Sequence, residues 1–137
     1  MILHEFHARS LEATLSQAEE SIHRMEHLLA EAGQDGVVRK VQCELPEDTR
    51  TRLLAGVTSL QELLATMAQS FSLQPHPLDL RRVLNAEISS LWVMFENCRP
   101  ERMKGYGQEF SPQVREALEK HVEAMLAKIL TLRAQLR

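Results

Sequence analysis

The residues best suited to chemistry are the basic side chains that follow position 98. Arg99, Arg102 and Lys104 stand close together, and Tyr106 lies between two glycines. The segment ends at Ser111 and a proline, a pair typical of a helix start. Cationic side chains beside the free N–H groups of a helix N-terminus attract anions. The sequence therefore predicts a site for a phosphate or carboxylate, with Tyr106 stacked on the ligand.

This basic segment has a structural alternative. Its spacing is not that of a P-loop or of a dinucleotide-binding fingerprint. The loop from 33 to 45 is expected at the same end of the molecule and adds Arg39 and Lys40. The alternative is a surface loop in which the cations pair with neighbouring acids and Tyr106 plugs the end of the fold. Those acids are Glu47, Asp48, Glu101 and Glu109.

Histidines are the second group that could do chemistry. His4, His7 and His76 are expected at the opposite end of the fold, near Asp79, where three imidazoles could hold zinc. Position 4 lies at a fraying terminus and position 76 in a proline-bounded turn, which favours no metal. A single Glu-x-x-His pattern, Glu20 with His23, has no second copy, whereas a di-iron bundle needs two. We therefore expect no metal and no cofactor.

A third candidate is a pair of polar residues on two helices. Glu87 falls on the inner side of its helix, and His121 adjoins the apolar seam of another. If those two helices are antiparallel, residues whose numbers add to about 210 lie at the same height. Glu87 and His121 then form a buried hydrogen-bonded pair, as a structural contact or as part of a small-molecule or metal site.

No arrangement for nucleophilic catalysis is present. Ser59, Ser89 and Ser90 lie within expected helices, and no Gly-x-Ser-x-Gly turn occurs. Cys43 and Cys98 lack the Cys-x-x-Cys spacing of redox and zinc sites, so we interpret them as small core residues. The sequence indicates a protein without catalytic activity.

Four helices must position these residues. Each carries apolar residues spaced alternately by three and four, the pattern of a helix with one buried seam. Glycines 33 and 36 end the first helix, Pro46 lies in the first turn of the second, prolines 75 and 77 separate the second from the third, and Arg99-Pro100 ends the third. The seams are 11, 15, 18, 22, 25, 29 and 32; then 53, 57, 60, 64, 67 and 71; then 84, 88, 91, 95 and 98; and last 118, 122, 125, 129, 132 and 136.

The connections between these helices favour antiparallel neighbours. The sequence therefore predicts an all-α fold, an antiparallel up-down-up-down four-helix bundle, in a single domain over residues 1–137. Residues 37–43 are β-branched in part, but a lone strand would leave its backbone unpaired, so we expect a loop there.

The bulk composition agrees with such a fold. The chain has 137 residues, of which 44% are hydrophobic and only 4% aromatic, proportions of a globular helical protein. A formal net charge of -3 gives no field that would gather nucleic acid. No apolar run approaches the ~20 residues that span a bilayer, and no secretory leader is recognisable. We expect a cytoplasmic protein with no nucleic-acid or membrane partner.

The run Leu91-Trp92-Val93-Met94-Phe95 is apolar around a full helical turn. In a bundle one strip of each helix faces water, so some of these side chains must lie outside, and Val93 is the best candidate. A second copy of the chain could cover that patch, which predicts a homodimer. The alternative cover is the 33–45 loop, through Val37, Val38 and Val41.

Together these patterns predict a small cytoplasmic helical-bundle module that binds a protein partner, still unknown, and has no catalytic activity. The alternative is a ligand- or metal-binding bundle, an enzyme or sensor. It would use the basic 99–107 segment for an anion or the histidines for a metal. Fold alone does not choose between them, because helical bundles host unrelated functions.

Overall fold

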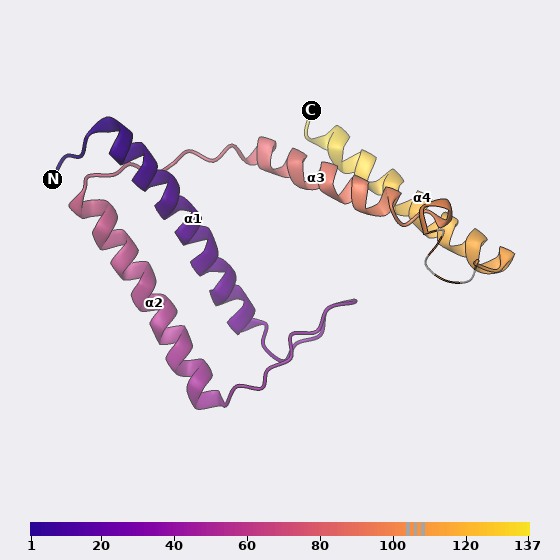
Figure 1. Cartoon of the computed structure of the whole chain (residues 1–137), viewed down its shortest axis with the longest axis horizontal. Coiled ribbons are helices and arrows are strands. Elements are labelled where there is room, and N and C mark those ends of the chain that lie inside the picture. Colours follow the sequence, from indigo (N-terminus) through magenta and orange to yellow (C-terminus); the bar gives the residue numbers. More distant parts are fainter. Residues whose placement is uncertain (104, 106, 108) are drawn as a thin grey trace. The chain divides into compact units, whose positions relative to one another are not determined.

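The structure, a computed structural model, describes residues 1–103, 105, 107 and 109–137. Over these residues the chain is all-α, with four α-helices and no β-strand, which confirms the predicted helical class (Figure 1). The elements are α1 (Glu5–Ala30), α2 (Glu47–Ser70), α3 (Leu80–Glu96), the 3-10 helix η1 (Pro100–Met103) and α4 (Pro112–Gln135).

The helix ends follow from local sequence. Asp79 caps α3, since its side chain accepts a hydrogen bond from the Arg82 amide, and Ser111 caps α4 in the same way from the Val114 amide. Pro112 then lies in the first turn of α4, where its missing N–H is not needed. Pro46 differs slightly from expectation: it occupies the N-cap of α2, one residue before the first turn.

The connection between α1 and α2 is a loop, as predicted, with one small ordered feature. Gly33 has φ +81, a conformation that favours glycine, and its amide donates to the Val41 carbonyl at 2.8 Å. Asp35 and Lys40 form an isolated antiparallel bridge and an ion pair at 3.9 Å. These contacts fold the loop back on itself without a strand.

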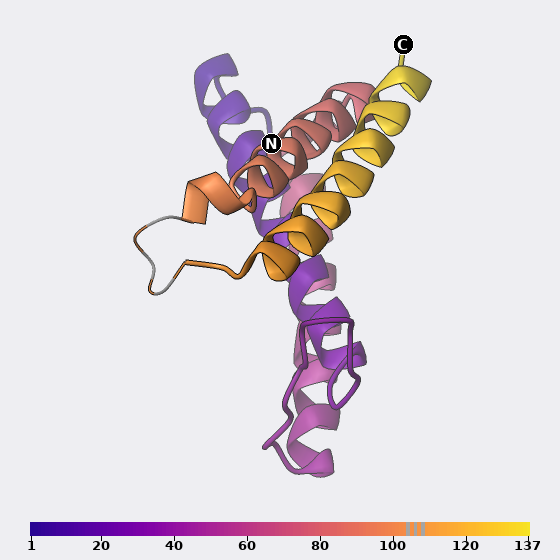
Figure 2. The ribbon, with the colours of Figure 1, turned by 90° about the vertical axis from the view of Figure 1, so that its right-hand side faces the viewer.

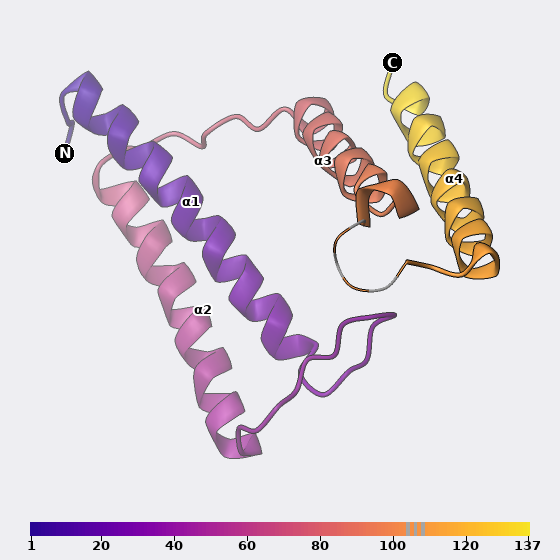
Figure 3. The same cartoon turned by 45° about the vertical axis from the view of Figure 1, so that its right-hand side comes forward.

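Packing divides the chain into two compact units, Met1–Pro77 and Leu78–Arg137, which we call hairpin 1 and hairpin 2. In hairpin 1, α1 packs beside α2 and the two run in opposite directions (Figures 1 and 3). In hairpin 2, α3 packs beside α4 in the same manner (Figure 2). The 3-10 helix η1 also contacts α4. Each hairpin is a unit of its own, and the single domain stays a prediction.

The buried core of each hairpin is thin. Besides Pro100 of η1, six apolar side chains are buried, and no polar side chain is buried among the described residues. Ile22 and Val57 belong to hairpin 1, while Ile88, Val122, Leu126 and Ile129 form one cluster in hairpin 2. Two helices in contact bury only one strip of each other's surface, so many residues of every predicted seam remain exposed to solvent.

The exposed seam residues of hairpin 1 gather on one side. With 3.6 residues per turn, they lie on the same flank of the contact between α1 and α2. Together with the flanking residues Leu28 and Leu63, they form what we call the apolar face of hairpin 1: Met25, Leu28, Leu53, Leu60, Leu63 and Met67, all exposed.

Hairpin 2 has the same organisation. Its predicted seams divide into residues that contact the partner helix, such as Ile88 and Val122, and residues that stay exposed. The exposed ones again share one flank of the helix pair. Together with the flanking residue Met94, they form the apolar face of hairpin 2: Leu84, Leu91, Met94, Met125 and Leu132.

Candidate functional site

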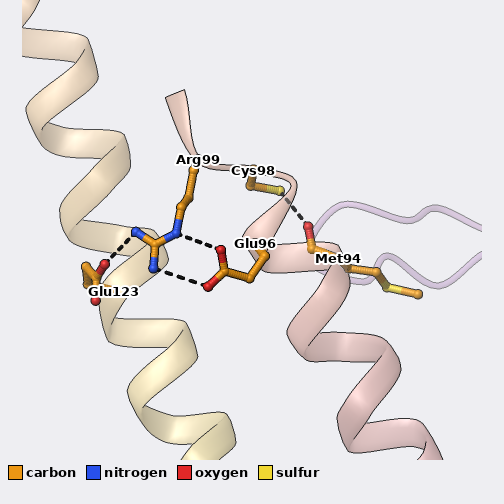
Figure 4. A network of polar contacts seen from close by, with 5 residues as sticks. All are labelled: Met94, Glu96, Cys98, Arg99 and Glu123. Atoms are coloured by element: carbon orange, nitrogen blue, oxygen red, sulfur yellow. Dashed lines mark hydrogen bonds and ion pairs between the residues drawn. The ribbon is translucent and has the colours of Figure 1, made fainter. Parts of the chain in front are cut away.

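Arg99, just after α3, is the centre of a network of side-chain hydrogen bonds and ion pairs (Figure 4). Its Nε donates to Glu96 at 2.9 Å and its Nη1 donates to Glu123 of α4 at 2.6 Å. Nη2 adds a second contact to Glu96 at 3.3 Å. The guanidinium therefore forms a fork with the carboxylate of Glu96, the last residue of α3, and a bridge to a second carboxylate on α4.

This network changes the acid–base properties of its members. The hydrogen bonds from Arg99 lower the pKa of Glu96 below its ordinary value of 4.5, and the nearby charges of Arg99 and Arg102 act in the same direction against partial desolvation. In turn, the hydrogen bonds to Glu96 and Glu123 raise the pKa of Arg99. Both shifts favour the charged forms of Glu96 and Arg99, so this ion pair persists at neutral pH.

The predicted anion site falls partly on this network. The Arg99 guanidinium donates hydrogen bonds to the carboxylates of Glu96 and Glu123, whereas the Arg102 side chain is exposed on η1. The Ser111 hydroxyl accepts from the Val114 amide as a helix cap. Lys104 and Tyr106 lie outside the described residues. A hollow of about 110 Å³ lined by Pro100, Met103 and Arg115 adjoins this segment. Binding of an anion here stays a prediction.

The structure does not bring Glu87 and His121 together. Both side chains are exposed, and no hydrogen bond joins them. The predicted register placed residue 111 opposite Arg99, but Arg99 contacts Glu123. The register of α4 against α3 therefore differs from the prediction by about three helical turns. The cause is the connection: η1 packs alongside α4, and α4 extends past the end of α3. Glu87 is therefore level with the last turn of α4, not with His121.

The structure does not bring His4, His7 and His76 together as one group of metal ligands. His4 caps α1, with Nδ1 accepting from the Phe6 amide at 3.3 Å, and its ring lies 6.0 Å from the ring of His7. His76 belongs to the segment after α2. Among the described residues, no group of three or more His, Cys, Asp or Glu is placed to hold a metal ion. His23 is exposed on α1, and His27 pairs with Glu31 at 2.9 Å.

The cysteines also have local roles. The Cys98 thiol donates to the Met94 carbonyl at 3.4 Å and packs against the core of hairpin 2 (Figure 4). Cys43 is half-buried in the loop of hairpin 1 and its thiol contacts the Leu45 carbonyl at 3.7 Å. Neither thiol has an imidazole partner among the hydrogen bonds of the described residues, so no Cys–His pair is formed there.

One feature was not predicted from the sequence, a groove of about 850 Å³ in hairpin 1. It runs between α1 and α2 and is closed at one end by residues 73–76. Three of its residues, Glu12, Glu19 and Glu26, are spaced by seven on α1. That spacing was readable in the sequence and predicts one face of a helix. What could not be read was that α2 places small residues opposite this face.

Comparison with known proteins gives no relative. No protein-family model matches the chain, and neither a curated protein nor a solved structure matches it at a significant level. Within the residues that the structure describes, no helix is long and apolar enough to cross a membrane. The function must therefore be inferred from the faces of the two hairpins.

Proposed function

We propose that the protein is a helical interaction module without catalytic activity, and that it works through the apolar faces of its two hairpins. A single observation carries this proposal. Among the described residues, the four α-helices bury six apolar side chains, while eleven seam or flanking residues stay exposed on the two apolar faces. Contiguous exposed apolar surface marks a site of association with another helical surface.

The chemistry of the two faces supports mutual association. On each helix of both faces the leucines and methionines are spaced by three, four or seven residues, a pattern with which helices pack side chains into each other's grooves. Two such faces laid together make the core of an up-down-up-down four-helix bundle. This arrangement also explains why α2 and α3 each have a seam wider than one partner helix can cover.

A homodimer extends the proposal. Val93 is 56% exposed and lies on the outer side of α3, away from the apolar face of hairpin 2. A bundle within one chain leaves it uncovered, and a second copy of the chain could cover it. The cytoplasmic location and the lack of nucleic-acid and membrane partners stay predictions from the sequence.

A double substitution tests the main proposal. Leu91 and Leu132 lie at the same height on the apolar face of hairpin 2, so L91E/L132E places two charges where association would bury them. The matched control S90E/A127E adds the same charges on the exposed outer side of the same helices. We expect a larger hydrodynamic radius and a lower melting temperature for L91E/L132E only. Identical behaviour of the two variants would reject association through this face.

The alternative, a ligand- or metal-binding protein, is distinguished by composition. Elemental analysis and native mass spectrometry of the purified protein measure what it retains. A bare polypeptide supports the interaction module, whereas a stoichiometric metal or a retained small molecule supports the alternative.

A further inference from the structure

The groove of hairpin 1 lies on the opposite flank of α1 and α2 from the apolar face. On α1, Glu12, Glu19 and Glu26 line the groove, whereas Met25 and Leu28 lie on the other side. On α2, Gln61 and Ala65 face the groove, as expected from their positions relative to the buried Val57. Association through the apolar face therefore leaves the groove open, and a ligand in the groove does not require the proposed bundle.

The lining combines an apolar floor with an acidic rim. Leu15, Leu64, Ala68 and Leu73 are half-buried and form much of the floor. Small side chains on α2 leave room above it. Three carboxylates stand along α1, and the lining contains no lysine or arginine. The groove therefore offers apolar contact along its centre and negative charge along one edge.

The three carboxylates are not equivalent. The Gln61 amide donates to Glu26 at 2.7 Å, and the Gln74 backbone amide donates to Glu12 at 3.3 Å. Each of these contacts crosses from α2 or the following segment to α1 and holds one end of the groove. Glu19, at the centre of the row, is exposed and takes part in no side-chain hydrogen bond or ion pair among the described residues.

Charge on the whole hairpin has the same sign as the groove. Residues 1–77 carry eleven acidic and six basic side chains, whereas residues 78–137 carry eight acidic and ten basic ones. The negative charge of the protein is therefore concentrated on the hairpin that contains the groove. Such a field attracts cationic partners to this surface and raises their rate of association.

We propose that this groove docks a basic amphipathic helix of another protein, one with an apolar stripe and a lysine or arginine at every seventh position beside it. The row from Glu12 to Glu26 is about 21 Å long, and its charges are about 10.5 Å apart, the rise of seven helical residues. An amphipathic helix fits such an open apolar groove through its stripe, and its cations meet the carboxylates. Among the described residues, no helix has two lysine or arginine side chains seven positions apart, so a second copy lacks the matching pattern.

The test uses a designed peptide of three heptads as the probe, with leucines at the stripe and lysine at every seventh position. Fluorescence anisotropy measures its binding to the full chain at low and moderate salt. Two control peptides have glutamate in place of lysine, or the same composition in an order without an apolar stripe. We expect binding of the first peptide only, weakened by salt.

Two protein variants locate the peptide. E12Q/E19Q/E26Q removes the charged row without changing its shape and should weaken binding about tenfold. E20Q/E44Q/E62Q removes the same charge from exposed positions of hairpin 1 outside the groove and should bind as the unmodified protein does. A65F, which fills the groove from the α2 side, should weaken binding while circular dichroism shows an unchanged helix content.

Several results would overturn the proposal. Equal binding of the glutamate peptide or of the peptide without a stripe would show that the groove is not recognised. Equal affinity of the two triple variants would show that only net charge matters. Loss of binding in L60E/M67E, with E12Q/E19Q/E26Q unaffected, would move the peptide to the apolar face.

Discussion

Arg99 donates to Glu123 at 2.6 Å and so joins the segment after α3 to the middle of α4. The same guanidinium is held by Glu96 through two further contacts, and its side chain is only 21% exposed. This bridge fixes the height of α4 relative to α3. Because the buried core of hairpin 2 is small, a contact that fixes register has a large share in specifying the pair.

Replacing Arg99 should therefore loosen hairpin 2. R99Q removes both ion pairs and leaves two carboxylates near each other, so we expect a lower melting temperature and a broader unfolding transition. R99K keeps the charge but lacks the planar fork, and its melting temperature should lie between R99Q and the unmodified protein. R24Q removes an exposed pair with Glu20 and serves as the control, with little expected change. Equal melting temperatures of R99Q and R24Q would contradict a register role.

The lowered pKa of Glu96 predicts how stability depends on pH. Its carboxylate is favoured in the folded state, so its contribution is present above the ordinary value of 4.5 and is lost as the pH falls through the lower pKa of the folded state. Denaturant melts between pH 7 and pH 3 should show stability falling in the acidic part of this range. E96Q should be less stable at pH 7 and have a flatter acidic slope.

The control for this pH profile is E87Q, which leaves the Arg99 network intact. Its acidic slope is the reference for the loss of one exposed carboxylate from α3. An E96Q profile parallel to that of E87Q would mean that Glu96 does not contribute to the pH dependence.

The core of hairpin 2 predicts that truncating one buried leucine strongly lowers the free energy of unfolding. Truncating an exposed leucine four residues further along α4 should change it little. Leu126 is 2% exposed, and truncation to alanine removes buried methyl groups and leaves a cavity, at a cost of about 2–4 kcal/mol. Leu130 is 48% exposed, so L130A should change the free energy of unfolding by less than about 1 kcal/mol. Chemical denaturation measures both. A large effect of L130A would show that another helix covers it.

The helices could be predicted from the sequence because their limits depend on nearby residues. Prolines 75 and 77, the cap at Ser111 and the glycine at 33 act within a few positions of themselves. The position of α4 relative to α3 depends on how η1 and the following segment return, which no local pattern encodes. The predicted Glu87–His121 contact was wrong for that reason, and the Arg99–Glu123 bridge was missed for the same one.

The groove of hairpin 1 illustrates a second limit. Its acidic row has a helical spacing that is present in the sequence, and the apolar seam was also found. The groove exists because Ala65 and Ala68 of α2 face that row, which requires the rotation of two helices about their axes. Small residues at those positions have no sequence signal of their own, since alanine is common anywhere in a helix.

The cap of α4 gives a prediction of stability that also bears on anion binding. The Ser111 hydroxyl accepts from the Val114 amide, and S111A should lower the free energy of unfolding by about 1 kcal/mol. S59A is the matched control: the Ser59 hydroxyl only donates back to the Ala55 carbonyl within α2. If phosphate or sulfate binds at this helix start, S111A should also reduce the stabilisation gained by adding the anion. Equal stability of S111A and S59A would argue against the cap.

Val93 separates two ways in which copies of the chain could assemble. It is 56% exposed on the outer side of α3, whereas Leu91 is 39% exposed and belongs to the apolar face of hairpin 2. If two copies meet through the outer patch, V93E should convert a dimer into a 15.7 kDa species in sedimentation runs at micromolar concentration, with the melting temperature of the dissociated chain unchanged. L91E should lower the melting temperature as well, because Leu91 lies on the face that the proposed bundle buries. A dimer that survives V93E and is lost in L91E would place the contact between copies on the apolar face. An unmodified protein that stays at 15.7 kDa as its concentration rises would instead exclude the homodimer.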